Sequence, residues 1–290
     1  MTAEQHPANE LLIGEQVQHV TCPIKTDNGK IGTGFLYTLA EKEGEILPCL
    51  VTNKHVIEGA STTSFTVTKQ TQDGAPCFGE QIELEIPVNN RRNHSNSEID
   101  LAVTLIGDRL NVFLDYNLSP FLIGIHKDNI AGDAYLNEMD AIEDIIMVGY
   151  PTGIFDEFNN LPITRKGITA SRIGLPYKGR PEFLIDCACF PGSSGSPIFQ
   201  FDRGPRQTCD GGWSIEEPRF KFLGILYGGP IFNATGEVIA VPVQTATKNI
   251  SKTNIMMNLG FCIRATELLA FETVFSKEIK EFMKPSSKKR

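Results

Sequence analysis

Short runs of β-forming residues, separated by turn residues, dominate this sequence and constrain its fold more than any other feature. The runs are rich in Val, Ile, Leu, Thr and Phe, and turn triplets such as Asp27-Asn28-Gly29 and Gln72-Asp73-Gly74 stand between them. We also expect a turn at Asn233-Ala234-Thr235-Gly236. Many short strands with few helical periods predict an all-β barrel or sandwich. The expected strands are residues 17–24, 34–39, 47–52, 64–69, 81–86, 101–106, 145–148, 167–173, 183–187, 197–201, 220–227, 238–243 and 260–263.

Composition narrows the classes of partner and the cellular compartment. The formal net charge is -8, and an acidic surface repels phosphate backbones, so no nucleic-acid partner is expected. No run approaches the roughly 18 apolar residues of a membrane-spanning helix, so no membrane partner is expected either. The first residues lack the basic start and apolar run of a signal peptide. Because the 7 cysteines are odd in number and lack framework spacing, we expect reduced thiols in a cytoplasmic protein.

The most informative segment is the Gly/Ser-rich stretch from Phe190 to Pro197, which contains Gly192-Ser193-Ser194-Gly195. A nucleophilic serine needs its hydroxyl on a tight turn, close to backbone N–H groups that can bind an oxyanion. Gly192 and Gly195 permit backbone angles that larger residues resist. The N–H groups of Gly192 and Ser194 are therefore the candidate oxyanion hole. Taken alone, the segment fits a surface loop equally well.

His55 and Asp100 are the candidate partners of this serine. His55 stands where the apolar run beginning at Leu50 ends, and histidine is the usual general base for an alcohol nucleophile because its pKa lies near neutrality. Asp100 precedes the expected strand 101–106 between apolar neighbours, so it should be partly buried. Singly, these residues are more often structural. With Ser194 they form the series His, Asp, Ser of a catalytic triad.

In this order the sequence resembles the trypsin-like serine peptidases of the chymotrypsin fold, especially the bacterial branch that includes the Deg (high-temperature-requirement) proteases. The resemblance implies that Ser194 attacks the scissile carbonyl, that His55 transfers the proton and that Asp100 orients the imidazole. It implies a serine endopeptidase acting on proteins or peptides, with no cofactor and no metal. The segments that carry it are Gly32-Thr33-Gly34-Phe35, Val51-Thr52-Asn53-Lys54-His55-Val56, Asp100-Leu101-Ala102-Val103 and Gly192-Ser193-Ser194-Gly195-Ser196-Pro197.

The resemblance also implies an all-β fold of two six-stranded antiparallel β-barrels, with the triad in the cleft between them and a C-terminal helix. We expect that helix because apolar residues recur at helical spacing after Ala265. The peptide-binding module that many Deg relatives carry after the second barrel is not expected here. The expected organisation is an N-terminal tail at 1–12, a first barrel at 13–107, a crossing at 108–139, a second barrel at 140–264, and the helix with a basic tail at 265–290.

Substrate preference depends on the residue that stands six positions before the nucleophile, which in this family lies at the base of the S1 pocket. Here it is Ala188, followed by Cys189, and this neutral floor predicts an uncharged, small-to-medium apolar P1 residue. Tyr227 and Gly228 are expected on the opposite wall, on a strand that pairs with the substrate backbone. Asp186 lies two positions before Ala188, so a local bulge would instead give a preference for a basic residue.

Three other readings compete with a serine peptidase. An α/β-hydrolase would need the order Ser, acid, His and a glycine two positions after the nucleophile, where this chain has Ser196. A metal site at Cys187 and Cys189 lacks a second pair of ligands at the usual spacing. The third reading is a latent or inactive protease-like binding domain, whose cleft an activating protein partner would order, because the irregular loop from Arg203 to Glu217 borders the expected site.

Overall fold

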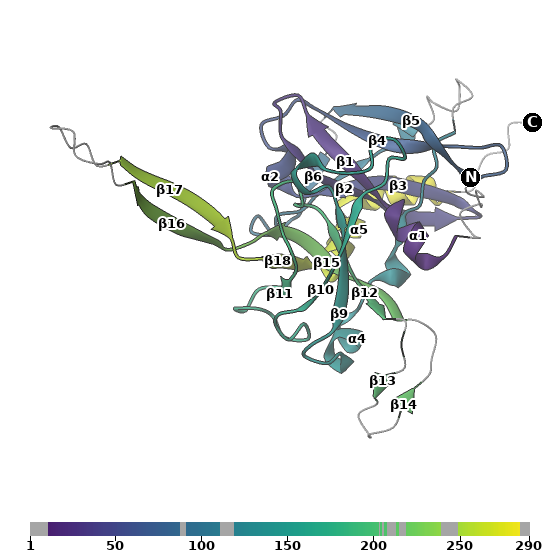
Figure 1. Cartoon of the computed structure of the whole chain (residues 1–290). Helices are drawn as coiled ribbons and strands as arrows, with labels where there is room; N and C mark the ends of the chain where they lie inside the picture. Colours follow the sequence, from purple (N-terminus) through teal and green to yellow (C-terminus); the bar gives the residue numbers. More distant parts are fainter. Residues whose placement is uncertain are drawn as a thin grey trace, which may run out of the picture.

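Antiparallel strands build both halves of the chain in the computed structural model (Figure 1). The predicted N-terminal tail up to residue 10, residues 111–118 of the predicted crossing, most of the 203–217 loop and the basic end of the chain lie outside the described residues. The structure describes residues 11–87, 91–110, 119–202, 204, 219–230 and 257–284, and the backbone of 206–207, 213–214, 231–238 and 249–256.

The N-terminal half is a curled sheet with the strand order β5-β4-β1-β2-β3-β7-β6, and β8 pairs in parallel with β2. Alternating burial along β4 and β5 shows one face of this sheet turned to the core and one to solvent. A closed barrel of six strands is expected here, and the structure shows an open sheet of 8 strands. Its strands are β1 Thr21–Thr26, β2 Ile31–Lys42, β3 Glu45–Thr52, β4 Thr62–Gln70, β5 Pro76–Pro87, β6 Arg91–Asn93, β7 Ala102–Leu105 and β8 Ile125–His126.

The C-terminal half is a closed barrel in the order β10-β11-β18-β15-β12-β9, in agreement with the sequence-based expectation. Closure leaves no free strand edge around the barrel wall itself. Two separate ribbons, β13–β14 and β16–β17, are attached to this half. The strands are β9 Asp144–Gly149, β10 Ile163–Thr169, β11 Glu182–Asp186, β12 Pro197–Asp202, β13 Arg206–Gln207, β14 Trp213–Ser214, β15 Arg219–Gly228, β16 Ile231–Val238, β17 Asn249–Met256 and β18 Leu259–Arg264.

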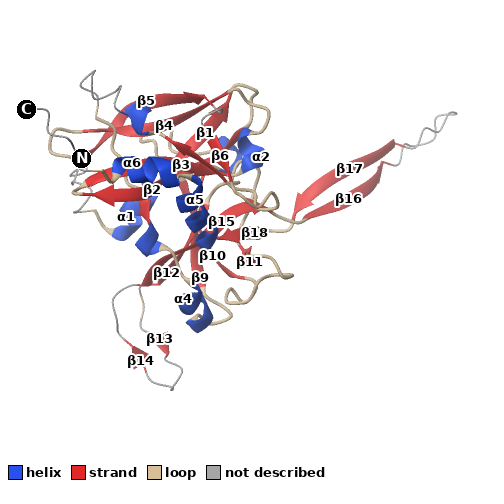
Figure 2. Ribbon diagram, turned by 180° about the vertical axis from the view of Figure 1, so that it is seen from behind, coloured by secondary structure: helices blue, strands red, loops and turns tan. Residues whose placement is uncertain are grey.

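Short helices join or cover the strands. The C-terminal segment bridges both halves, because η4 contacts β15 and α6 contacts β2 (Figure 2). The α-helices are α1 Ile13–Gln18, α2 Lys54–Ile57, α4 Asp133–Glu138, α5 Ala270–Val274 and α6 Ser276–Phe282, and the 3-10 helices are η2 Lys127–Asn129, η3 Pro151–Gly153 and η4 Ala265–Leu269.

One apolar core joins the two halves, in addition to a core inside each of them. Phe35 of β2 meets Phe222 of β15 edge to face, with ring centroids 5.5 Å apart. Leu268, Phe271 and Phe275 of the C-terminal segment complete this shared core and are almost fully buried. The halves therefore meet over a packed interface, and the candidate catalytic residues stand along it.

Three local expectations from the sequence are wrong. Val17, expected to begin a strand, lies inside α1, and β1 begins only at Thr21. Glu15 accepts a hydrogen bond of 2.8 Å from the Leu12 backbone and so stabilises the first turn of α1. The turn expected at 233–236 lies inside β16, because pairing with β17 holds it extended. The single C-terminal helix is three short segments, with a break at Phe275, whose φ of -101° and ψ of 21° leave the helical region.

Candidate active site

The structure brings His55 and Asp100 together. His55 Nδ1 lies 2.5 Å from Asp100 Oδ2, and the His55 backbone N–H donates to Asp100 Oδ1 at 3.2 Å. An ionised carboxylate only accepts hydrogen bonds, so Nδ1 carries the proton and Nε2 presents its lone pair. The His55 side chain is 45% exposed and that of Asp100 23% exposed, which leaves the ring open to a substrate. This pair has the geometry of a general base with its orienting acid.

Lysine and asparagine side chains hold α2 and the aspartate loop in place. Lys30 Nζ donates to the carbonyl oxygens of His55 and Glu58 at 2.9 and 2.8 Å, and so satisfies the C-terminal end of the short helix. Asn53 Nδ2 donates to the backbone carbonyl of Asp100 at 2.8 Å. These bonds fix the relative position of the imidazole and the carboxylate from the backbone side.

The serine loop has two glycines that no other residue could replace without movement. Gly192 and Gly195 have φ angles of +86° and +91°, which L-residues rarely adopt. A Cβ on Gly195 would lie 2.0 Å from the carbonyl oxygen of Thr33, and one on Gly192 would lie 2.7 Å from that of Tyr150. The loop therefore lies directly against the start of β2 and the end of β9.

The peptide groups of this loop are oriented by hydrogen bonds on their carbonyl sides. The carbonyl of Pro191 accepts from the Thr152 backbone at 2.6 Å, and the carbonyl of Ser193 accepts from Ser196 at 3.0 Å. In a planar trans peptide the N–H points away from the C=O, so the N–H groups of Gly192 and Ser194 point the other way. Among the described residues, neither of these two N–H groups has a hydrogen-bond acceptor. Two free donors beside a serine hydroxyl have the arrangement of an oxyanion hole.

The hydroxyl of Thr33 ties this loop to the N-terminal half. It donates to the carbonyl of Gly192 at 2.9 Å and accepts from the Tyr150 backbone at 3.1 Å. A hydroxyl has one proton, so the 3.4 Å contact with Ser196 Oγ must have the serine as donor. The Thr33 backbone N–H also donates to the carbonyl of Ser194 at 2.9 Å. Thr33 is completely buried, so it anchors both sides of the nucleophile without access to water.

The Ser194 hydroxyl is partly exposed and its hydrogen bond among the described residues goes to the Tyr227 carbonyl, at 3.5 Å. The structure therefore does not join Ser194 to His55 by a hydrogen bond. The two residues are nevertheless carried by adjoining backbone, because Thr52 Oγ1 donates to the Thr33 carbonyl at 2.8 Å. A bond of 3.5 Å is weak, and catalytic hydrogen bonds are often long before substrate binds.

Comparison with known proteins assigns this arrangement to a family. Residues 32–204 match the trypsin-like peptidase domain, which is more than half of the chain. The chain belongs to the trypsin-like peptidase family. A solved structure similar to this trypsin-like domain is the apo protease domain of MamO from Magnetospirillum magneticum, at 12% identity, with 89% of this chain and 98% of that chain covered and a TM-score of 0.44. A search of curated proteins found no match.

The predicted S1 residues of this trypsin-like domain lie on the two segments that flank Ser194. Ala188 is half-buried, and its carbonyl accepts from Arg165 Nη1 at 2.6 Å, while Cys189 is 2% exposed. Tyr227 is half-buried and its phenol donates to Glu182 Oε2 at 2.9 Å. A Cβ built on Gly228 meets no atom within 4 Å, so this position faces open space.

Burial decides the chemistry of the thiols near the serine loop. Desolvation raises the pKa of Cys189 to about 12, and it raises the pKa of the Cys262 thiol well above its ordinary value. Both cysteines, and Cys187, have free thiols. Since the thiolate is the reactive form, these protonated side chains pack in the barrel of the trypsin-like domain rather than act as nucleophiles.

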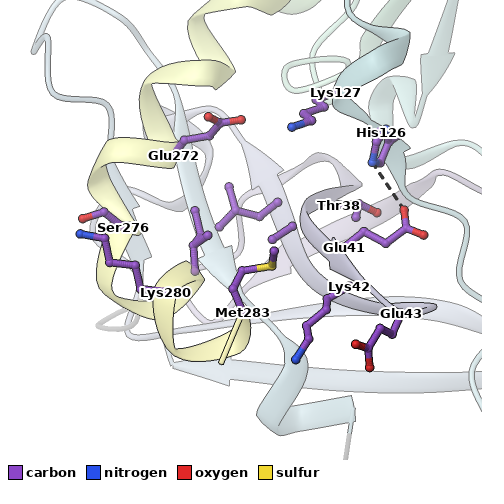
Figure 3. A pocket seen from close by; sticks show the side chains of 13 residues that line it. Thr38, Glu41, Lys42, Glu43, His126, Lys127, Glu272, Ser276, Lys280 and Met283 are labelled. Atoms are coloured by element: carbon purple, nitrogen blue, oxygen red, sulfur yellow. Dashed lines mark ion pairs between the residues drawn. The ribbon is translucent and has the colours of Figure 1, made fainter. Parts of the chain in front are cut away.

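A cavity of about 610 Å³ lies away from this site, between β2, the start of η2 and the C-terminal helix α6 (Figure 3). His126 Nε2 lies 3.6 Å from Glu41 Oε2 at its rim, where Figure 3 marks the ion pair. None of the predicted catalytic or substrate-binding residues lines this cavity. Among the described residues, the cavity and the candidate active site are therefore two separate places.

Sequence reasoning missed several residues that position the site. Thr33 stands in the glycine-rich segment before the histidine, but nothing in the sequence says that its hydroxyl reaches residue 192. Thr152 has a φ of 51°, which is strained for a threonine, and its N–H orients the Pro191 carbonyl. Arg165 lies with its guanidinium carbon 4.8 Å from the centroid of the Phe190 ring. All three are distant in sequence from the residues they hold, so only the fold identifies them.

Proposed function

We propose that this protein is a serine endopeptidase that hydrolyses peptide bonds through an acyl-enzyme, with His55, Asp100 and Ser194 as its catalytic triad. The observation that carries the proposal is the orientation of the peptide groups around Ser194. The carbonyls of residues 191–193 accept hydrogen bonds from other groups, and the N–H groups of Gly192 and Ser194 have no acceptor among the residues that the structure describes. Two N–H donors on the same loop as a serine hydroxyl, both turned away from the engaged carbonyls, are what an oxyanion hole requires.

The proposed reaction assigns one role to each of these groups. The Ser194 hydroxyl leaves the weak bond to Tyr227, donates its proton to His55 Nε2, and Oγ forms a bond to the scissile carbonyl carbon. The N–H groups of Gly192 and Ser194 stabilise the oxyanion. His55 returns the proton to the leaving amine as the C–N bond breaks. A water then attacks the acyl ester, again through His55, and releases the acid with the serine regenerated.

Asp100 supports these proton transfers by holding the Nδ1 proton of His55. The ring is thereby kept in the tautomer that accepts at Nε2, and the imidazolium formed during attack has a carboxylate beside it. Replacing Asp100 by asparagine should lower kcat by roughly 10⁴ with little change in KM, because an amide that donates to Nδ1 favours the tautomer with the proton on Nε2, which cannot act as the base.

We further propose an uncharged, small-to-medium apolar P1 residue. Ala188 places no charge at the position that sets P1 choice in this family, and Asp186 is exposed at the end of β11. The Arg165 guanidinium nearby is engaged by the Ala188 carbonyl and covers the Phe190 ring. Profiling with a peptide library tests this: strong selection for Lys or Arg at P1 would point to Asp186 and contradict the proposal.

The narrower assignments rest on the sequence. We propose membership of the Deg-type branch, a cytoplasmic location with reduced thiols, and protein or peptide substrates. The segments Gly32 to Phe35 and Gly192 to Pro197 support the branch. The free thiols of the six described cysteines are compatible with a reducing compartment. Among the described helices, none is both long and apolar enough to cross a lipid bilayer.

The second candidate is a latent protease-like domain that needs an activating protein partner. The bond from Ser194 to Tyr227, in place of one to His55, favours this reading specifically. In this case a substrate or partner would have to move the Ser194 hydroxyl from the Tyr227 carbonyl to His55 Nε2.

A fluorophosphonate probe, which reacts with activated serines, separates these candidates. We expect labelling of the wild-type protein and none of Ser194→Ala. Ser193→Ala is the matched control, because this neighbouring hydroxyl is 1% exposed and has no hydrogen-bond partner among the described residues, so labelling should persist. Labelling of Ser194→Ala at the wild-type level would contradict the triad. Labelling that begins only after addition of cell extract would favour latency.

A further inference from the structure

The β16–β17 ribbon is a two-stranded sheet that is separate from both larger sheets. β15 ends at Gly228, and after Gly229 and Pro230 the chain continues as β16, while β17 leads back through Met257 and Asn258 into β18. Gly228 is paired with Phe261, and the next pair outward is Ile231 with Met256. Figures 1 and 2 show the ribbon projecting away from the barrels. It is therefore the outward continuation of the β15–β18 pair.

The edges of this continuous pair can be followed from the candidate active site outward. β12 covers one side of β15 only as far as Ile225. Past that point the serine loop takes its place: Gly195 N–H donates to the Leu226 carbonyl at 2.8 Å, and Ser194 Oγ contacts the Tyr227 carbonyl. Among the described residues, no strand pairs with this side of β15 beyond Tyr227, and this edge lies beside the Ser194 hydroxyl.

The same edge continues along β16. β18 lies on the opposite side of β15, and β17, which leads into β18, lies on the corresponding side of β16. The side of β16 that faces away from β17 is therefore the continuation of the side of β15 that faces Ser194. Within the described residues, β16 pairs with no strand other than β17, so this edge carries unpaired N–H and C=O groups over its 8 residues.

A ribbon of this kind is poorly stabilised by itself. A two-stranded hairpin is at best marginally stable in water, and an open edge is a template for a further strand. The two strands are paired at 8 successive positions and belong to no other described sheet. A third strand added along β16 would supply the missing pairing.

From this continuity we propose that the free edge of β16 is an extended substrate-binding site. It takes an extended segment of the polypeptide substrate, on the N-terminal side of the scissile bond, as an additional antiparallel strand. The inference rests on the proposed function, since it uses the same strand that pairs with substrate beside Ser194. Antiparallel pairing sets the direction: as β15 and β16 run outward from the site, the substrate runs outward toward its own N-terminus.

Recognition of this kind depends on backbone groups more than on side chains. Half of the residues of β16, in alternation, direct their N–H and C=O groups to the free edge. The matching substrate segment has about 8 residues and a length of roughly 26 Å, at about 3.3 Å per residue. The preferred substrate is then an unfolded or locally extended polypeptide without proline in this segment, and short peptides are poor substrates.

Binding to full-length Ser194→Ala tests the inference without requiring catalysis. The probes are the fluorescent hexapeptide Ala-Ala-Val-Ser-Ala-Lys, the same peptide with an N-terminal extension of four Thr-Val repeats, and the same peptide with that extension at its C-terminus. We expect the N-terminal extension to lower Kd about tenfold, which corresponds to one or two net hydrogen bonds after the loss of chain entropy. The C-terminal extension should change Kd less than about twofold.

Two changes test whether the gain in affinity of the N-extended peptide comes from the edge of β16. Replacing residues 233–254 by an Asn-Gly turn in the same background shortens the ribbon and should abolish the gain of the N-extended peptide, with hexapeptide affinity unchanged within about twofold. N-methylation of the extension at every second residue removes hydrogen bonds without changing the protein, so it tests the same edge even where the shortened chain fails to fold. The methyl groups can begin at the first or at the second residue of the extension, and one of these two patterns should remove the gain in affinity.

Several results would overturn the inference. These are equal affinity of all three peptides, an equal gain from the C-terminal extension, and a gain that persists in the shortened ribbon or after methylation in both patterns. Light scattering adds another: if shortening the ribbon converts a dimer to a monomer and leaves peptide affinities unchanged, the edge is an interface between copies. Failure of the wild-type protein to cleave a peptide that binds in the expected pattern would count against the proposed peptidase activity alone.

Discussion

Replacing Thr33 by valine removes one buried hydroxyl and nearly preserves the shape of the side chain. That hydroxyl donates to Gly192 and accepts from Tyr150 and Ser196, and Thr33 is fully buried. A buried backbone group left without a partner costs about 1–3 kcal/mol, so two such groups predict a loss of about 2–6 kcal/mol in the free energy of unfolding. Ser196 adds little, because its hydroxyl is 3.4 Å from Thr33 Oγ1, which is already a weak hydrogen bond.

The same substitution should slow catalysis. Gly192 supplies one of the two proposed oxyanion donors, and its carbonyl loses the bond that fixes it to β2. Removing an oxyanion donor lowers kcat by about 10²–10³, and displacing it should lower kcat by about tenfold to a hundredfold. KM should stay within about threefold, because the oxyanion contact forms in the transition state and not in the bound substrate.

Kinetics on a fluorogenic peptide with valine before the scissile bond, together with urea unfolding, give both quantities. Thr33→Ser keeps the hydroxyl and should retain most of the activity. Thr63→Val is the matched control, since Thr63 is 5% exposed and its hydroxyl has no hydrogen-bond partner among the described residues. If Thr33→Val equals Thr33→Ser in both kcat and stability, the anchoring role assigned to the hydroxyl is refuted.

Three further predictions concern stability. Desolvation lowers the pKa of His19 from its ordinary 6.5 to about 4, so between these pH values the unfolded chain binds the proton more readily than the folded one. Stability is therefore lost as the pH falls from 6.5 to about 4. In a series of Tm measurements over this range, His19→Phe should show a smaller fall in Tm than the wild type. Gly195→Ala should prevent labelling by fluorophosphonate and lower Tm, whereas Gly228→Ala, with open space at its Cβ, should leave Tm unchanged; equal Tm values would contradict this. Arg219 Nη2 lies 3.0 Å from Glu143 Oε2 in a partly buried ion pair, so Arg219→Met should cost about 1–3 kcal/mol in urea unfolding, and no measurable loss would argue against a stabilising ion pair there.

Three features show which parts of the fold could be predicted from the sequence and which could not. The strands and the order His55, Asp100, Ser194 could be predicted, because β-forming runs, turn residues and short motifs are local properties of the chain. The turn expected at 233–236 could not be corrected locally, since those residues are extended only through pairing with β17. The break at Phe275 likewise depends on packing against the shared core.

The sequence alone determined the fold class and named the three side chains of the candidate triad. Tertiary structure decided how they are held: the 2.5 Å contact of His55 with Asp100, and the anchoring of the serine loop by Thr33. It also decided that Ser194 bonds to Tyr227, and that the edge beside it continues along β16. The physical reason is that hydrogen bonds and strand edges depend on positions in space, which residues far apart in the chain reach only when both halves pack together.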